Sequence, residues 1–177
     1  GSRLRARTEG VSKSNRGGWH SAGNLFENEA PCIQELKSHA TQSVLSATET
    51  IGAKADISAF DLKLFAWMNA NVPGGYNAPH THPGAHWSGV YYVAQPEVET
   101  GSSGKIEFLD PRSDLPNWRR LQAPPFSAKK AFRPEPGELI LFPSYLVHWV
   151  HPNETPDERV TVAFNATFRK TRKGRKA

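Results

Sequence analysis

Residues 77–93, NAPHTHPGAHWSGVYYV, hold three histidines within seven positions and lead directly into an apolar segment typical of a β-strand. His80 and His82 are separated by one residue, and side chains two positions apart on an extended strand point to the same face. Both imidazoles can therefore reach one metal ion without a special turn. The neighbouring prolines and Gly84 disfavour a helix, so we expect a strand that ends in a loop at the histidines.

One domain is the simplest organisation for 177 residues, which are enough to bury a core without disulfides. Cys32 is the only cysteine, which excludes an intramolecular disulfide and a cysteine-based zinc site. We expect Cys32 to be buried on a helix, and we expect a reducing compartment, most simply the cytoplasm. No apolar run approaches the length of a membrane-spanning helix, so we expect a soluble protein.

The net charge of +5 is concentrated at the two ends of the chain. Residues 1–16 carry five basic side chains and one acidic one, and residues 169–177 carry six basic ones, which leaves −5 for the residues between them. Basic ends can bind nucleic acid or an acidic partner through counterion release, but disordered, solvated termini explain them as well. Because no stacking-aromatic module or helix-turn-helix pattern accompanies them, we do not expect nucleic-acid binding.

The chain divides into three parts by composition. We interpret residues 1–17 as a disordered basic segment, residues 18–168 as one domain and residues 169–177 as a basic tail. Pro31 and the apolar spacing after it predict a helix over roughly residues 31–50 that covers one face of another layer. Residues 18–20 are expected to begin the ordered structure as a short strand. Alternating apolar and polar residues between Gly- and Pro-rich turns predict further β-strands over the following ranges: 60–72, 76–82, 87–95, 105–109, 138–142, 146–150 and 159–168.

Two further segments interrupt the predicted strands. Residues 72–75, Val-Pro-Gly-Gly, are predicted to turn the chain. Residues 110–127 form a long excursion with four prolines, which is typical of a functional loop such as a lid. Trp118, Arg119 and Arg120 in this excursion hint at an anionic or acidic partner. One helix packed on eight or so short strands predicts a mainly β fold of jelly-roll type.

A second histidine motif lies in residues 137–148, GELILFPSYLVH. A strand, a tight turn and a returning strand would bring His148 back towards the first histidines. Arg159 follows eleven residues later, and Thr161 lies on the same face of its predicted strand. These residues are therefore expected near the metal site.

Together the motifs resemble the 2-oxoglutarate-dependent Fe(II) oxygenases, whose pattern is His-x-Asp/Glu, a distant His and Arg-x-Ser. The resemblance covers residues 60–168 and is strongest with a bacterial branch that has the phrases H-x-H-P, S-G-V-Y-Y and G-x-L-x-x-F-P-S…H. It implies a double-stranded β-helix that binds Fe(II), 2-oxoglutarate and O2. It also implies hydroxylation of a substrate C–H bond coupled to decarboxylation of 2-oxoglutarate to succinate and CO2, while desaturation or demethylation is also allowed.

The resemblance assigns roles to individual residues. His80 and His148 match the two metal-binding histidines. Arg159 matches the residue that pairs bidentately with the distal carboxylate of 2-oxoglutarate. Thr161 and, if it faces the interior, Tyr92 would give that carboxylate further hydrogen bonds.

One position departs from the family pattern, because His82 stands where a carboxylate ligand is usual. We expect His82 to complete a set of three histidine ligands, as in thiol dioxygenases and cupins. Two alternatives stay open. His82 could line the site without binding the metal, or Glu107 or Asp110 could supply the carboxylate.

The other histidines and the aromatic residues fit structural or surface positions better. The histidines expected at the surface or in exposed loops are His20, His39, His86 and His151. The aromatic residues expected in the core rather than in a substrate pocket are Trp67, Trp87, Trp149 and Tyr91.

Two other functions remain open. A cupin-like three-histidine metalloenzyme would not use 2-oxoglutarate, and Arg159 would then be structural. A non-catalytic jelly-roll binding module would not need His80 or His148. Under the oxygenase reading, a small metabolite, an amino acid and a peptide or protein side chain are all compatible substrates.

Overall fold

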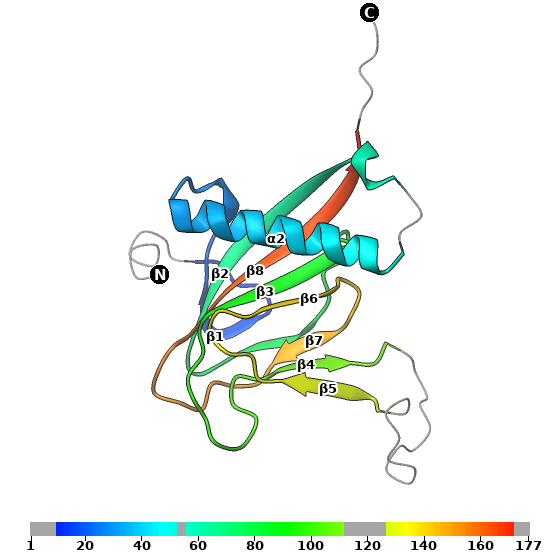
Figure 1. The fold of residues 1–177 in the computed structure, drawn as a ribbon. Helices are drawn as coiled ribbons and strands as arrows, with labels where there is room; N and C mark the ends of the chain where they lie inside the picture. The colour runs from blue at the N-terminus through cyan, green and yellow to red at the C-terminus, as the bar shows by residue number, and fades with distance from the viewer. Residues whose placement is uncertain (1–9, 53–55, 112–126, 172–177) are drawn as a thin grey trace, which may run out of the picture.

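The structure is a computed structural model that describes residues 10–52, 56–111 and 127–171, and it confirms the predicted mainly β fold with one flanking helix (Figure 1). Two short 3-10 turns, η1 (Leu25–Glu27) and η2 (Ile57–Ala59), precede the helix and the second strand. The helix and strands are α2 (Pro31–Thr50), β1 (Asn15–His20), β2 (Phe60–His80), β3 (Trp87–Ala94), β4 (Ile106–Leu109), β5 (Lys129–Phe132), β6 (Leu139–Pro143), β7 (His148–Val150) and β8 (Arg159–Lys170).

The strands form one curled antiparallel sheet in the order β5-β4-β7-β2-β8-β3-β6, with β1 paired to β2. The long strand β2 belongs to both layers of the fold. Residues 60–71 pair with β8, whereas Asn77 and His80 pair with β7. The larger layer therefore contains β8, β3 and β6, and the smaller layer contains β7, β4 and β5 (Figure 1). This is the jelly-roll arrangement that the sequence predicted.

Residues 72–75 do not turn the chain as predicted. β2 continues through them, with Gly74 at a φ of 78°, a conformation that glycine adopts without strain. The pairing of β1 with β2 shifts register here, between Arg16 and Gly18. This irregularity lies where β2 changes its partner from β8 to β7, so it carries the histidines from one layer to the other.

Helix α2 lies across the outer face of the larger layer, as predicted (Figure 1). Pro31 occupies the first turn, where its missing N–H is not needed. Cys32 was predicted to be buried but is exposed in this first turn. The core between helix and sheet contains Leu25, Phe26, Ala40, Val44, Ala66, Met68, Trp87, Val162, Phe164 and Ala166.

The N-terminal part of the domain begins earlier than predicted. We expected disorder up to residue 17, but β1 starts at Asn15, whose side chain is buried. The backbone N–H of Ala78 donates to the Ser14 carbonyl at 2.9 Å. This hydrogen bond holds the residues that precede β1 close to His80. β5 lies in a segment for which no strand was predicted.

Some predictions fall on parts of the chain outside the described residues. The predicted lid with Trp118, Arg119 and Arg120 lies there, as do residues 1–9 and 172–177 of the basic ends. Within the described ranges, no helix combines the length and the apolar character needed to cross a membrane.

Candidate active site

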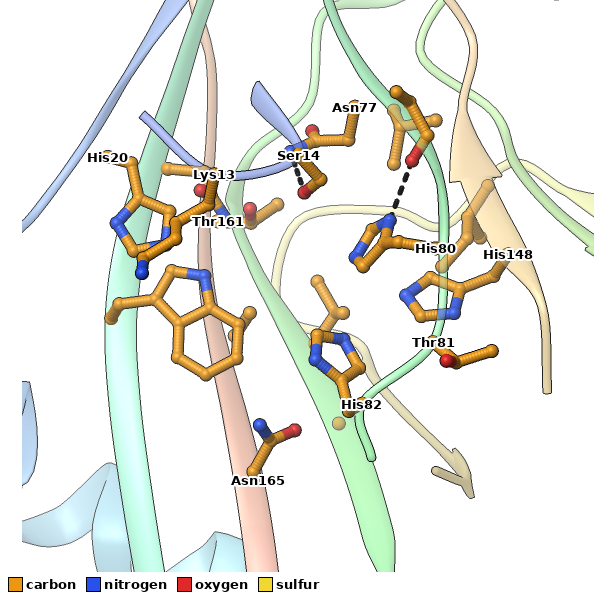
Figure 2. Close-up of a pocket in the computed structure, with 18 of the residues that line it drawn as sticks. Lys13, Ser14, His20, Asn77, His80, Thr81, His82, His148, Thr161 and Asn165 are labelled. Atoms are coloured by element: carbon orange, nitrogen blue, oxygen red, sulfur yellow. Dashed lines mark hydrogen bonds between the residues drawn. The ribbon is translucent and has the colours of Figure 1, made fainter. Parts of the chain in front are cut away.

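A cavity of about 560 Å³ opens between the two layers of the sheet (Figure 2). Residues from β2, β3, β4, β6, β7 and β8 line it, so it lies in the middle of the jelly roll. Of the six residues that the sequence assigned to a site, five line this cavity: His80, His82, His148, Arg159 and Thr161.

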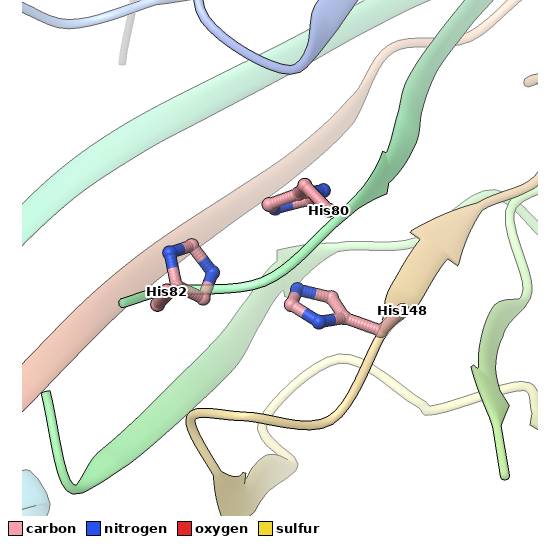
Figure 3. A group of neighbouring side chains, drawn as sticks. All are labelled: His80, His82 and His148. Carbon is pink, nitrogen blue, oxygen red and sulfur yellow. The ribbon is translucent and has the colours of Figure 1, made fainter. Parts of the chain in front are cut away.

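Three histidines meet at one side of this cavity (Figure 3). His80 ends β2, His82 follows it in the loop, and His148 begins β7. One nitrogen of each imidazole lies within 4.8 Å of the corresponding nitrogens of the other two. Imidazole nitrogens about 2.1 Å from one ion lie no more than about 4.2 Å apart. Small side-chain rotations would therefore bring all three rings onto one metal ion.

Backbone carbonyl groups orient two of the three rings. Nδ1 of His80 lies 2.7 Å from the Ala78 carbonyl oxygen, and Nδ1 of His148 lies 3.0 Å from that of Leu146. Because a carbonyl oxygen can only accept, each Nδ1 carries the proton and each Nε2 offers a lone pair. His82 makes no such ring hydrogen bond to the described residues, so its ring is the least constrained of the three.

Burial keeps the histidine cluster neutral. It lowers the pKa of His80, it lowers the pKa of His148 to about 4, and it lowers the pKa of His82 to about 3. The neighbouring imidazoles add a smaller effect in the same direction at His82 and His148. Neutral imidazoles can bind a divalent cation without first losing a proton.

The described residues of this cluster include no carboxylate. Ile106 lines the cavity, so its neighbour Glu107 lies on the opposite face of β4. There the Glu107 carboxylate accepts from Trp149 Nε1 at 3.1 Å and pairs with Lys129 at 3.2 Å and His151 at 3.3 Å. Neither Glu107 nor Asp110 belongs to the cluster, which leaves His82 as the third candidate ligand.

Arg159 is buried in the same cavity without an acidic partner among the described residues. Its side chain is 1% exposed, and its Nε donates to Gln95 Oε1 at 3.0 Å. The guanidinium carbon lies 5.2 Å from the centre of the Tyr92 ring. Burial lowers the pKa of Arg159, because the charged form loses its water. Burying a guanidinium without a counter-charge is costly, so the cavity is suited to an anion beside it.

Tyr92 faces the interior of the jelly roll, as its expected role at the carboxylate of 2-oxoglutarate requires. It shares a face of β3 with the cavity residue Val90 and pairs with Thr161 on β8, although it does not itself line the cavity. It is fully buried, and its hydroxyl makes no hydrogen bond to the described residues. Burial raises its pKa, and the charge of Arg159 and the approach of this guanidinium to the hydroxyl oxygen offset part of this effect. The hydroxyl proton has no acceptor among the described residues. Such an orphaned hydroxyl points to an absent ligand.

Two residues of the cavity wall were missed by the sequence analysis. Trp67 was expected in the core but lines the cavity, and His20 was expected at the surface but is only 8% exposed. The two rings stack, with centroids 5.5 Å apart and an angle of 11° between their planes. The alternation of β2 placed Trp67 on one face together with Phe65 and Asn69, but it did not show which face lines a cavity.

Other side chains were predicted with mixed success. His39 and His86 are exposed, and neither belongs to the metal cluster, as expected. His151 was expected at the surface but is only 14% exposed, because it packs against Trp149 and pairs with Glu107. Trp87 lies in the core, where its Nε1 donates to Thr48 Oγ1 at 2.9 Å.

The fold and the cavity define a class of protein: a jelly roll whose cavity contains a histidine cluster that could hold a metal ion and a buried arginine. A family model described as "Putative 2OG-Fe(II) oxygenase" matches residues 65–165. The chain belongs to this family, and it is therefore an oxidoreductase. Membership implies Fe(II), 2-oxoglutarate and O2 as metal and co-substrates.

Solved structures share the fold at low sequence identity. A prolyl-4-hydroxylase from Pseudomonas putida has a TM-score of 0.63 and 18% identity over 96% of this chain and 82% of its own. The α-ketoglutarate-dependent epimerase SnoN has a TM-score of 0.64 and 14% identity over 94% of this chain and 68% of its own. HygX from Streptomyces hygroscopicus, with nickel and 2-oxoglutarate bound, has a TM-score of 0.59 and 11% identity over 94% and 76%. No curated protein sequence matched the chain.

Proposed function

We propose that this protein is an Fe(II)- and 2-oxoglutarate-dependent dioxygenase that hydroxylates its substrate and converts 2-oxoglutarate to succinate and CO2. One observation carries the proposal: a cluster of three neutral histidines shares a cavity with a buried arginine that has no acidic partner among the described residues. Proteins that share the fold include a prolyl-4-hydroxylase and an epimerase, and we propose hydroxylation because it is the usual outcome implied by the family resemblance. The catalytic domain would comprise residues 18–168 together with the start of β1 and the segment that precedes it.

The residues present fit both the metal and the co-substrate. Imidazole nitrogens are suitable ligands for Fe(II), so His80, His82 and His148 would hold the metal. Gln95 accepts from Nε of Arg159, and the terminal N–H groups, which also lie near the Tyr92 hydroxyl, would pair with the distal carboxylate of 2-oxoglutarate. Thr161 lies two residues away on the same strand face and would add a hydrogen bond.

Tyr92 fits the same role from the neighbouring strand. Its hydroxyl is buried without a hydrogen-bond partner, and its ring lies against the guanidinium of Arg159. A carboxylate bound by Arg159 would give this hydroxyl an acceptor and would so remove the cost of leaving it unpaired.

Bound Fe(II), together with 2-oxoglutarate and O2, would supply the oxidation of a substrate C–H bond. The protein's own residues hold and orient the ligands. Carbonyl groups fix the rings of His80 and His148, and burial keeps all three imidazoles neutral. The apolar side chains of Val90, Ile106 and Phe142 form part of the cavity wall. Three neutral ligands offer the metal no negative charge, so this charge would come from 2-oxoglutarate.

The test is an anaerobic titration of the metal-free protein with Fe(II) and then with 2-oxoglutarate, followed by the visible charge-transfer band of the chelate. We expect the band in the wild type and in Arg159→Lys at higher 2-oxoglutarate concentration, and we expect Arg159→Ala to lose it. Oxygen should then yield succinate. If Fe(II) binds but 2-oxoglutarate leaves the spectrum unchanged, the protein is a cupin-like metalloenzyme instead. If Fe(II) does not bind, the jelly roll is a non-catalytic binding module.

A further inference from the structure

The cavity extends beyond the residues that the proposed function uses. Its outer part is lined by the segment around β1 and by the adjoining face of β2 (Figure 2). No Asp or Glu is among the described residues that line the cavity, and its charged wall residues are all basic. The residues of this outer part are Lys13, Ser14, Arg16, His20, Phe65 and Trp67. We call them the outer subsite.

Trp67 connects the outer subsite with the metal cluster. The centroid of its indole lies 5.6 Å from the ring of His82 and 5.5 Å from the ring of His20. Phe65, two residues earlier on the same face of β2, lies 6.3 Å from Trp67. An apolar or flat group resting on the indole would therefore lie beside the candidate metal ligand His82.

The ring of His20 stacks on the indole of Trp67 and adds no positive charge there. Its Nδ1 lies 2.8 Å from the Ser21 carbonyl oxygen and so carries the proton. Burial lowers the pKa of His20, and the charge of Lys13 lowers it further, so the ring is neutral at neutral pH. Lys13 therefore supplies the positive charge at this end of the aromatic surface.

The backbone at Lys13 is fixed by hydrogen bonds. Its N–H donates to Asn15 Oδ1 at 2.7 Å, and Asn15 Nδ2 donates to the Gly18 carbonyl at 2.8 Å. Arg16 Nη1 donates to the carbonyl groups of Lys13 at 3.0 Å and Asn15 at 2.9 Å. Nη1 of Arg16 therefore holds the segment, whereas the ammonium group of Lys13 has no hydrogen bond to the described residues and is the basic group we assign to a ligand.

The side chain of Lys13 lies beside His20, the residue that stacks on Trp67 (Figure 2). It makes no hydrogen bond or ion pair with the described residues. Arg159 lines the same cavity and likewise has no acidic partner among the described residues. Because 2-oxoglutarate would occupy Arg159, Lys13 remains available for a second anion.

We propose that the outer subsite binds an anionic organic substrate, with the anionic group on Lys13 and the carbon skeleton on Trp67. This inference rests on the proposed function, because it places the substrate beside a metal that the histidines would hold. The arrangement selects for a negatively charged group at one end of the substrate and an apolar group towards the metal. Cationic substrates are disfavoured by Lys13, because 2-oxoglutarate would offset the charges of Arg159 and the metal.

The experiment compares organic acids with their uncharged primary amides. A series of aliphatic and arylalkanoic acids and the matching amides is titrated into the anaerobic protein loaded with Fe(II) and saturating 2-oxoglutarate, so that Arg159 is already occupied. Ligand-observed NMR measures affinity, and the paramagnetic relaxation caused by Fe(II) reports which end of the ligand lies near the metal. We expect the acids to bind better than the amides, with the apolar end closer to Fe(II).

Charge variants locate the anion-binding residue. Lys13→Gln should weaken binding of the acids roughly fivefold, the upper range for an exposed ion pair, and leave the amides unchanged. Lys170→Gln is the matched control, because it removes the same charge at an exposed position outside the cavity. Trp67→Phe should weaken acids and amides alike, because it changes the surface under the carbon skeleton.

Three outcomes would overturn the subsite. Acids and amides could bind equally, Lys13→Gln could behave like Lys170→Gln, or the preference for acids could depend on Arg159 instead of Lys13. The charge-transfer band of the 2-oxoglutarate chelate is recorded in the same samples. A normal band without a preference for acids contradicts only the outer subsite, whereas a missing band in the wild type contradicts the proposed function.

Discussion

His80 and His148 are direct partners across the antiparallel pair of β2 and β7, and the centroids of their rings lie 4.3 Å apart. Residues directly opposite each other in a sheet point to the same face, so the register of two strands alone brings these imidazoles together. His82 is positioned in a different way. It lies in the loop after β2, where its backbone N–H donates to the Ser144 carbonyl at 3.0 Å. The site therefore combines a pair fixed by the sheet with a third histidine held by a loop.

This difference predicts how the metal site responds to the loss of His82. In His82→Ala, the sheet still holds His80 and His148, so we expect Fe(II) binding to weaken by at least about 100-fold without loss of the fold. Anaerobic competition against a chelating dye measures the affinity. His86→Ala is the control, because His86 is exposed and outside the cluster. Equal affinities in His82→Ala and the wild type would mean that His82 only lines the cavity.

The sequence predicted convergence of the histidines but not the whole wall of the cavity. A His-x-His pattern on a strand fixes a shared face, and a strand, turn and strand return His148 to it. The burial of Trp67 could not be interpreted in the same way, because both faces of β2 are covered. In this part of β2, even-numbered residues such as Ala66 and Met68 face helix α2, and odd-numbered residues such as Phe65 and Trp67 face the cavity.

The segment around β1 was the least predictable part of the site. Residues 10–17 are polar and basic, and this composition usually indicates disorder. Their order depends on hydrogen bonds from the side chains of Asn15 and Arg16 to the backbone and on pairing with a strand far away in the sequence. Such interactions leave no periodic pattern, so the role of His20 was missed as well.

The buried ring of His20 predicts a specific pH dependence of stability. Its pKa in the folded protein lies below the usual value of 6.5. The unfolded chain therefore binds more protons than the folded one below about pH 6.5, and the free energy of unfolding falls as the pH falls. His20→Gln removes this contribution. Denaturant unfolding of the metal-free protein between pH 7 and pH 5 should show a smaller loss of stability in His20→Gln.

The control for this prediction is His39→Gln, because His39 is exposed on α2, with 67% of its side chain accessible. This variant also removes one histidine, but from the surface, so a change seen only in His20→Gln comes from the buried ring. The histidines of the metal cluster remain in both variants, so neither becomes independent of pH. Parallel curves for His20→Gln and the wild type would contradict the assigned effect of burial.

Gly89, the second residue of the S-G-V-Y-Y phrase, is required by the packing of the core. A Cβ atom at this position would overlap the ring of Phe164, which is 1% exposed and packs against Phe26. We expect Gly89→Ala to lower the free energy of unfolding by about 1–3 kcal/mol, as overpacking does in other cores. Thermal and denaturant unfolding measure the change.

A double-mutant cycle tests the cause. Phe164→Leu replaces the ring by a smaller side chain. This substitution by itself destabilises the protein, but it makes room for the added methyl group. The two substitutions together should therefore cost less than the sum of their separate effects. Strict additivity would show that the contact with Phe164 is not the reason for glycine at position 89.

Replacing Tyr92 by phenylalanine is expected to change stability and co-substrate binding in opposite directions. Its hydroxyl is buried without a partner, and leaving such a group unsatisfied costs about 1–3 kcal/mol. Tyr92→Phe should therefore stabilise the metal-free protein by about 1 kcal/mol. If the hydroxyl donates to the distal carboxylate of 2-oxoglutarate, the same substitution should weaken 2-oxoglutarate binding to the Fe(II) protein by roughly tenfold. Anaerobic titration of the charge-transfer band measures this affinity.

The two measurements separate a structural from a binding role. A more stable Tyr92→Phe protein with unchanged affinity for 2-oxoglutarate would leave Tyr92 as packing beneath the guanidinium of Arg159, 5.2 Å from its ring. A less stable protein would mean that the hydroxyl is already satisfied in the metal-free state. Thr161→Val provides the comparison on β8, because it removes the other hydroxyl expected at the same carboxylate with little change in shape. Weakening by both substitutions would show that the carboxylate lies between the paired strands β3 and β8.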